Sequence, residues 1–196
     1  MLARHFHQMA CSNAWANHRL LKACMRLSPE AFAAPRTGFF PSIAATLNHL
    51  LTVDWYYVDA LERWRQGREA NRDPSPFFAS DVPHPDARSL HAAQRASDDR
   101  LIALCAALDD ARLGEHVPVM RRAGLEPERA DRLLGHLFQH QVHHRVFSAQ
   151  GLEHIRRGGI LSAGGLPSAI GRQQPQMHEQ HIRELLGRVD VERAVM

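Results

Sequence analysis

The sequence predicts an all-α fold, a four-helix bundle with a long crossover connection and a short C-terminal helix. Four stretches carry apolar residues at helical spacing, and proline and glycine separate these stretches. No stretch shows the alternation that is typical of a half-buried strand. A chain of 196 residues has a common length for one domain and can bury a sizeable core. We therefore expect residues 1–196 to form a single domain.

The first two predicted helices differ in what their inward faces carry. The first spans residues 2–27, and Asn13 and Asn17 fall in its apolar stripe, which is unusual for a plain core. The second spans residues 42–67, with Ser42 as its N-cap. Its apolar face is broad, which suits a helix with neighbours on two sides.

A proline-rich connection separates these helices from the next two. Residues 67–85 contain four prolines, and loops of this length often cover a site or cross the end of a bundle. The third helix is predicted over residues 86–108 and the fourth over residues 128–152. A glycine-rich stretch follows, and then a short last helix over residues 176–187.

The composition argues against nucleic-acid and membrane partners. Lys and Arg number 24 against 21 Asp and Glu, and the basic residues are scattered among acids, whereas a nucleic-acid surface needs a cluster. No run approaches the roughly 18 apolar residues of a membrane span, and the N-terminus lacks the apolar region of a secretory signal. The three cysteines are far apart, without a C-x-x-C pair. We therefore expect a cytoplasmic protein.

Histidine is in excess, with 14 in 196 residues, and one pair has a spacing that matters. His140 and His144 are four residues apart, so they share one face of the fourth helix. Both fall within about 20° of the axis of its inward stripe, while His136 and His143 fall on the flank. The residues that set this axis are Leu133, Leu137, Phe147 and Gly151.

Two imidazoles in the middle of an apolar face need hydrogen bonds or a metal ion. Burial without partners costs on the order of 1–3 kcal/mol for each. One divalent ion, bound through neutral ring nitrogens, satisfies both rings. The alternatives are two hydrogen-bonded core histidines or a histidine-rich face that lines a polar channel. Because H-x-x-x-H arises by chance in a histidine-rich chain, the spacing alone leaves these alternatives open.

Two ligands on one helix do not make a stable site, so a third must come from elsewhere in the chain. Periodicity places His7 and His18 opposite the inward stripe of the first helix, and His91 well off the stripe of the third. His49 lies at the border between the apolar and polar faces of the second helix. This position permits an inward reach without requiring it, so geometry ranks His49 first by a small margin.

Three stretches resemble a known family in the order in which they occur. They are NAWANHRLL at 13–21, TLNHLLTVDWYY at 46–57 and GHLFQHQVHHRVFSAQ at 135–150, with a weaker similarity in QPQMHE at 174–179. The sequence resembles the DinB superfamily, a set of bacterial four-helix-bundle proteins with a three-histidine metal site. No single motif is very specific, but the ordered set covers most of the chain.

The resemblance implies a ligand set. It implies that His49, His140 and His144 bind a divalent transition metal, zinc or nickel, both of which suit imidazole donors. Two positions depart from the family pattern, since Gln139 stands where asparagine is usual and Val146 where a small residue is common. These departures leave the three ligands intact.

Four further residues are candidates for the second shell of the site. Asn13 and Asn17 could bond to water or ligands at the site, or to each other and to backbone. Asp54 follows His49 as the acid of the family pattern, and it could orient a ligand ring or pair with Arg145.

The resemblance also implies a class of chemistry. Members of the superfamily include thiol-dependent transferases and isomerases, so we expect a metal-dependent thiol S-transferase, or a related hydrolase or isomerase, that acts on a small electrophile. No cysteine of the chain occupies a ligand position, so the thiol would be a low-molecular-weight cofactor. The catalytic residues stay unassigned.

Two other classes of function remain open at this point. One is a non-catalytic metal-binding protein whose ion is structural or sensory, and the other is a stress-response interaction module with an incidental metal. We expect a homodimer with a small-molecule substrate, and an outward Trp15 is a weak indication of the interface.

Overall fold

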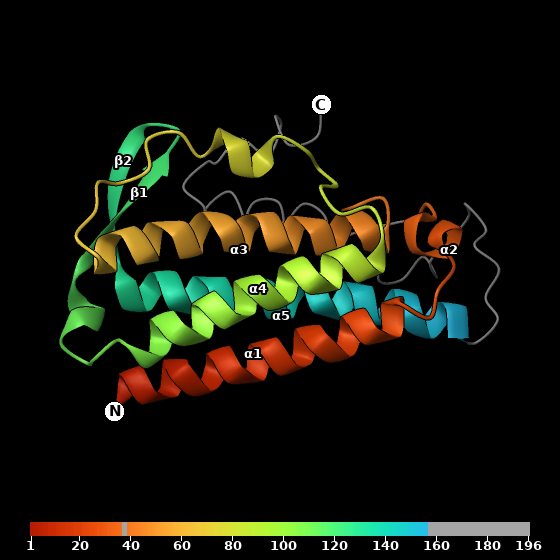
Figure 1. Cartoon of the computed structure of the whole chain (residues 1–196), viewed down its shortest axis with the longest axis horizontal. Coiled ribbons are helices and arrows are strands. Elements are labelled where there is room, and N and C mark those ends of the chain that lie inside the picture. Colours follow the sequence, from red (N-terminus) through yellow and green to blue (C-terminus); the bar gives the residue numbers. More distant parts are fainter. Residues whose placement is uncertain (37–38, 157–196) are drawn as a thin grey trace, which may run out of the picture.

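A computed structural model describes residues 1–36 and 39–156 of the chain. The described part is mostly helical, as predicted, with one small two-stranded sheet. Four long helices lie side by side (Figure 1). They are α1 (Leu2–Cys24), α3 (Ile43–Arg65), α4 (Ala87–Ala106) and α5 (Ala130–Arg156). The last helix predicted, over residues 176–187, lies outside the described residues.

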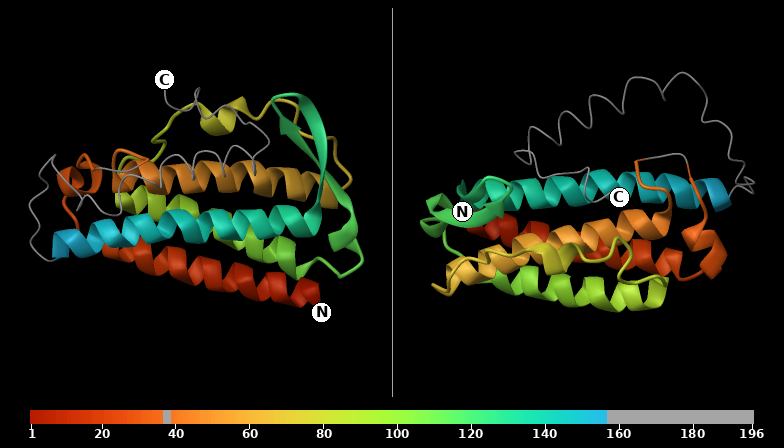
Figure 2. Two further views of the ribbon diagram at one scale, coloured as in Figure 1. Left: turned by 180° about the vertical axis from the view of Figure 1, so that it is seen from behind. Right: turned by 90° about the horizontal axis from the view of Figure 1, so that it is seen from above.

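Each long helix packs against two others. Helix α1 contacts α4 and α5, and helix α3 contacts the same two. Figure 2 shows this arrangement from behind and from above. Helices α1 and α5 run in one direction and α3 and α4 in the other (Figure 1). The connection over residues 66–86 runs back along α3, and it contains the short 3-10 helix η1 (Ser75–Phe78).

Local capping explains where the helices begin. The hydroxyl of Ser42 accepts a hydrogen bond from the backbone of Ala45 at 3.0 Å, which is the N-cap predicted for α3. Asp86 caps α4 in the same way, through the backbone N–H groups of Arg88 and Ser89. A short helix that was not predicted, α2 (Pro29–Ala33), follows the cap residue Ser28.

Buried apolar side chains form two clusters, at opposite ends of the long helices. One contains Phe6, Tyr57, Leu61, Leu101, Leu104, Leu133 and Leu137, and the other contains Leu21, Phe32, Leu47, Leu51 and Leu90. Along each helix, polar residues stand between the two clusters. We call this set the polar layer, and its members are Asn13, Asn17, Asp54, Gln94, Asp98, Gln141 and Arg145.

Residues 116–129 correct the prediction that the chain has no strand. Strand β1 (His116–Arg121) pairs antiparallel with β2 (Gly124–Arg129), and α5 therefore begins at Ala130 and not at residue 128. Pro118 lies opposite Pro127 in this register. Prolines usually argue against a strand, but both strands of a two-stranded ribbon are edges, where a missing N–H can face outward.

The hairpin is held against α3 by side-chain contacts. The guanidinium of Arg121 donates to the hydroxyl of Tyr57 at 3.1 Å, and Tyr56 donates its hydroxyl proton to the carbonyl of Met120. Val117 and Val119 are buried in the larger cluster while their neighbours face outward. This alternation is the one strand signal, and it covers too few residues to stand out in the sequence.

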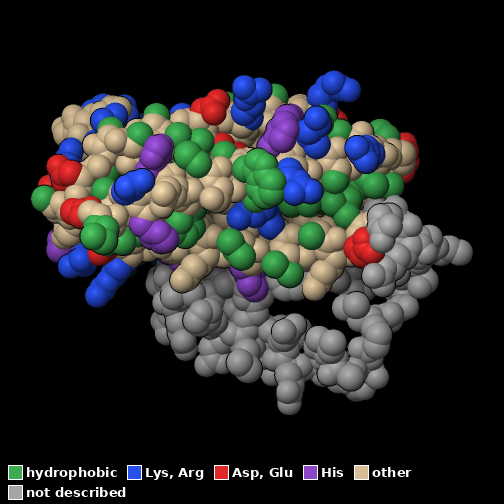
Figure 3. Space-filling view, turned by 90° about the horizontal axis from the view of Figure 1, so that it is seen from below, with side chains coloured by type: hydrophobic (Ala, Val, Ile, Leu, Met, Phe, Trp, Pro, Cys, Tyr) green, Lys and Arg blue, Asp and Glu red, His purple; other side chains and the backbone are tan. Residues whose placement is uncertain are grey.

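The surface of the described part is mixed in character. In the view of Figure 3, basic, acidic and histidine side chains are spread among apolar ones. No helix within residues 1–36 and 39–156 combines the length and hydropathy needed to cross a membrane. Trp15 is exposed, with the guanidinium of Arg19 stacked 4.8 Å from its ring, and the predicted homodimer stays a prediction.

The turn of the hairpin gives a first testable prediction. Gly124 has φ +122°, which L side chains rarely adopt, so we expect Gly124→Ala to lower the free energy of unfolding by about 1–3 kcal/mol. An added Cβ at Gly114 also meets nothing within 4 Å, and its φ is not positive, so Gly114→Ala is the matched control. Urea denaturation measures both. Equal stability of the two variants would contradict the turn described here.

Candidate metal centre

The structure brings together the three histidines predicted as metal ligands. His49 lies on α3, and His140 and His144 lie one turn apart on α5. One ring nitrogen from each lies within 4.8 Å of the other two. The Nε2 atoms of His49 and His140 are 3.2 Å apart. In the part of the chain that the structure describes, no other three His, Cys, Asp or Glu side chains meet in this way. We call this group the histidine triad.

The rings of the triad converge without stacking. The ring centroids are 5.1 Å apart for His49 and His140, 5.1 Å for His49 and His144, and 4.5 Å for His140 and His144. The interplanar angles are 59°, 73° and 68°, respectively. Rings tilted in this way can direct a nitrogen each toward a common point.

Burial keeps two rings of this site, those of His49 and His140, uncharged. It lowers the pKa of His49 to about 4. The pKa of His140 is also well below its usual range, first because of burial and then because of the other histidines around it. Both rings are therefore neutral at neutral pH, which is the form that binds a metal ion.

The geometry of the donors fits a divalent transition ion. Two nitrogens at about 2.0–2.1 Å from one tetrahedral ion lie about 3.4 Å apart. The separation of 3.2 Å between His49 and His140 is close to this value. Three imidazoles are a ligand set of zinc sites that keep one position open. Nδ1 of His140 is buried and has no hydrogen-bond partner among the described residues. The orientation of this ring is therefore not fixed by a hydrogen bond from Nδ1 to a carboxylate or a carbonyl.

Phe40 packs against two members of the triad, and the sequence did not predict this contact. Its ring lies 4.4 Å from the ring of His49 at 34°, and 5.5 Å from that of His144 at 61°. Phe40 lies in the connection between α2 and α3, two residues before the N-cap Ser42. A residue in an irregular segment has no periodic pattern to indicate its direction, so the sequence carried no signal for this contact.

His136 is a second neighbour of the triad, placed on the flank of α5 by periodicity. Its ring lies between those of Tyr57, at 5.5 Å, and His140, at 6.1 Å. Burial, and then the charge of Arg121, lower the pKa of His136 to about 4. The one-turn spacing of His136, His140 and His144 extends the row of histidines along α5 toward the hairpin.

Three candidates for the second shell meet in the polar layer. Nη1 of Arg145 donates to the side-chain oxygens of Asn17 at 2.8 Å and Gln141 at 3.1 Å, and also to that of Asn13. The amide of Asn17 donates to Asp98 at 2.9 Å. Both asparagines are thus bound to Arg145, on the helix that carries two of the histidines.

Asp54 lies in the same layer, and among the described residues no hydrogen bond joins it to a ring of the triad or to Arg145. It accepts hydrogen bonds from the amides of Gln94, at 2.8 Å, and Gln141. Its Oδ1 is buried without a hydrogen-bond partner in the described part of the chain. The amide nitrogen of Gln141 donates to Asp54, and its amide oxygen accepts from Arg145, so Gln141 links the two side chains indirectly. Its role in a second shell stays a prediction.

Burial shifts the acids of the layer toward their neutral forms. It raises the pKa of Asp54 to about 7, against the opposing effects of the two amide donors and the charge of Arg145. Burial also raises the pKa of Asp98 to about 6, and the hydrogen bond from Asn17 opposes this shift. An unpaired Oδ1 on Asp54 is consistent with a proton on that carboxyl near neutral pH.

Comparisons with known proteins agree with this fold. The family model described as the DinB family matches residues 1–164. The crystal structure of a DinB-like protein from Bacillus cereus ATCC 10987 is similar, with a TM-score of 0.56 and 16% sequence identity, covering 82% of this chain and 95% of that one. At this identity the likeness concerns the fold alone. No curated protein matches the sequence.

The position of Arg145 predicts a large effect on stability. Arg145→Met removes the donor shared by the three side-chain oxygens of the polar layer, so we expect the free energy of unfolding to fall by roughly 3–5 kcal/mol. Arg132→Met, at an exposed position on the same helix, should change it by less than about 0.5 kcal/mol. Urea denaturation distinguishes the two, and similar midpoints would show that the guanidinium does not hold the layer.

The raised pKa of Asp54 predicts a pH dependence. The folded chain keeps this proton up to about pH 7, whereas the unfolded chain loses it near the ordinary value of 3.8. The folded state binds more protons in between, so this carboxyl lowers stability as the pH rises from about 4 to 7. Asp98 and Arg145 are the charged groups that act on it.

Replacing Asp54 by Asn removes this group alone. We therefore expect the stability of Asp54→Asn, relative to the unchanged protein, to rise across pH 4–7 and then to level off. The buried histidines contribute equally to both proteins, so their effect cancels in the difference. Urea denaturation at several pH values measures it. A difference that is constant across this range would mean that Asp54 titrates alike in the folded and unfolded chains.

Proposed function

The chain belongs to the DinB family, and we propose that it binds one divalent transition metal through His49, His140 and His144 and transfers a low-molecular-weight thiol to a small electrophile. The observation that supports the metal site is the convergence of three ring nitrogens from two helices within 4.8 Å of one another. Zinc and nickel are the ions proposed, because both suit neutral imidazole donors.

Three protein ligands leave room for a reactant at the ion. When bound, the ion would hold the thiol at its open position as the thiolate, since coordination lowers the pKa of a thiol. The protein contributes neutral rings, because burial lowers the pKa of His49 and His140. Phe40 places an apolar ring against His49 and His144, which keeps water away from that side of the ligands.

The nucleophilic sulfur has to come from a separate molecule. Burial raises the pKa of Cys24 and of Cys105 to about 12, so neither is a thiolate at neutral pH. Cys11 is exposed on α1, where its sulfur lies 3.8 Å from His7. In the proposed reaction, the thiolate forms a bond to the electrophilic carbon, the leaving group departs with its bonding electrons, and the thiol proton is released to solvent. No side chain is assigned to that proton.

One observation favours a non-catalytic alternative. The triad joins α3 to α5, so an ion held there would crosslink two helices that are far apart in sequence. Such an ion stabilises the native chain whether or not it carries a reactant, because it binds only the folded state. A structural or sensory role in a stress response is therefore the second candidate.

Several broader expectations belong to the same proposal. We propose that residues 1–196 form a single domain, and that the four long helices are a four-helix bundle whose crossover is the connection over residues 66–86. A cytoplasmic homodimer that acts on a small molecule, without nucleic-acid or membrane partners, completes it. The second-shell roles of Asn13, Asn17, Asp54 and Arg145 are part of the proposal too.

Replacing a single histidine of the triad tests the proposed metal site. Protein without a histidine tag should contain one metal ion per chain at the triad, and His144→Ala should lose that ion, since even outer-shell changes cost roughly 10–100-fold in affinity. His143→Ala, the same change one residue away, should keep the ion. His49→Gln, which retains a similar volume, repeats the test if His144→Ala folds poorly. Elemental analysis measures the content, and full metal in His144→Ala would overturn the site.

Turnover separates the two candidate functions. The metal-loaded protein should consume a low-molecular-weight thiol when a reactive electrophile is present, and His144→Ala should not. His143→Ala again serves as the control. If chelation lowers the melting temperature while no thiol is consumed with any electrophile of a broad panel, the structural role is supported and the transferase is rejected.

A further inference from the structure

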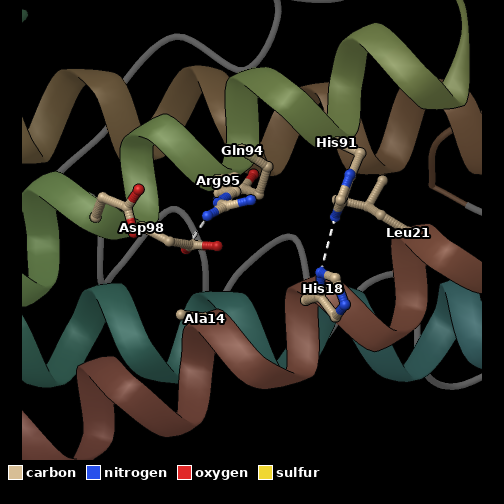
Figure 4. A pocket seen from close by; sticks show the side chains of 8 residues that line it. Ala14, His18, Leu21, His91, Gln94, Arg95 and Asp98 are labelled. Carbon is tan, nitrogen blue, oxygen red and sulfur yellow. Dashed lines mark hydrogen bonds between the residues drawn. The ribbon is translucent and has the colours of Figure 1, made fainter.

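A second contact between histidines lies outside the triad. His18 on α1 and His91 on α4 are 73 residues apart, yet Nδ1 of His18 lies 2.9 Å from Nε2 of His91. Their ring centroids are 5.0 Å apart, at 49° to one another. Figure 4 shows the two rings meeting across the space between the helices. Periodicity had placed both residues away from the inward faces of their helices, so the triad does not account for them.

The pair borders a pocket between α1 and α4. The cavity has a volume of about 150 Å³, and its other lining residues include Gln94, Arg95, Asp98 and Asp99. A water molecule takes about 30 Å³ in the liquid, so several waters fit there. Figure 4 shows the Asp98 carboxylate across the pocket from the histidines.

The separation of the two nitrogens suits joint ligation of one ion. Two nitrogens at about 2.05 Å from an ion and 2.9 Å from each other subtend about 90° at that ion. This is the angle between neighbouring ligands in the square-planar and octahedral geometries of copper(II) and nickel(II). The corresponding distance in the triad, 3.2 Å, gives a wider angle, nearer to the tetrahedral one.

The charges around the pocket permit a cation. Arg95 is one of the residues that line it, and its guanidinium is positively charged. Two acidic residues, Asp98 and Asp99, line the same pocket and outnumber this arginine.

Asp98 also has an oxygen left for a further contact. Asp98 is only 5% exposed. In the described part of the chain, its hydrogen bonds from Asn17 and Gln94 both go to Oδ1. Oδ2 makes neither of these bonds, so it can accept from a water in the pocket.

We propose that His18 and His91 form a second site for a divalent transition ion of the copper or nickel type, separate from the triad. Water in the pocket completes the coordination, and the Asp98 carboxylate accepts a hydrogen bond from that water. The ion links α1 to α4 and stabilises the folded chain, because the two ligands meet only in the native state. This site does not depend on the function proposed for the triad.

Titration with Cu²⁺ tests the proposal. The chain without a histidine tag should take up one more equivalent of Cu²⁺ than His18→Gln or His91→Gln does, as measured by calorimetry. His116→Gln, which changes an exposed histidine on β1, should bind as many equivalents as the unchanged chain. His144→Ala should lose the ion of the triad and keep this one, so a failure of either site is recognised separately.

A second measurement identifies the ligands of this ion. The electron paramagnetic resonance spectrum of Cu²⁺ in His144→Ala should show two coupled imidazole nitrogens, and this signal should be lost when His91→Gln is added. If His18→Gln and His91→Gln bind as many Cu²⁺ ions as His116→Gln, the pair is an ordinary hydrogen bond between imidazoles and the proposal is wrong.

Discussion

A layer of buried polar side chains, with a guanidinium within it, is the constraint on which the rest of the structure depends. A polar group buried without a partner costs on the order of 1–3 kcal/mol, so each member of the layer restricts the position of the others. Arg145 of α5 donates to two asparagines of α1, and Gln141 of α5 donates to Asp54 of α3. Asn17 of α1 donates to Asp98 of α4. All four long helices are therefore joined at one level, between two apolar clusters that by themselves would allow the helices to rotate or slide.

This layer also sets the direction of the histidines. Gln141 and Arg145 each follow a histidine of the triad by one position, so α5 carries two parallel rows about 100° apart. The hydrogen bonds of Gln141 and Arg145 hold their row toward α1 and α3. The rotation of α5 that satisfies these bonds is the one that turns His140 and His144 toward His49. A contact in the interior thus positions ligands that it does not touch.

The sequence predicted the parts of this arrangement that repeat along a helix. Helical spacing placed His140 and His144 on the inward face of α5, and the structure has them there. His49 lies at the border between the apolar and polar faces of α3, so periodicity allowed an inward position without requiring it. The family resemblance was needed to select His49 as the third ligand. Phe40 lies in a connection without periodicity, and residues 116–129 pair through prolines that favour other interpretations. Four members of the polar layer, Asn13, Asn17, Asp54 and Arg145, were candidates from the sequence. Their partners Gln94, Asp98 and Gln141 were not, because hydrogen bonds between distant residues leave no local pattern.

The two histidine contacts show how one geometry acquires different properties from its surroundings. His49 and His140 meet at 3.2 Å, and His18 and His91 at 2.9 Å, so the distances alone do not distinguish them. Around the first pair, an aromatic ring and a third imidazole replace water, and burial lowers the pKa of His49 to about 4. The second pair borders a pocket with two carboxylates and an arginine. An ion at the first position would be surrounded by neutral groups in a medium of low dielectric constant, where it acts strongly on a bound reactant. An ion at the second would be screened by water and charged side chains, which suits a link between helices better than chemistry.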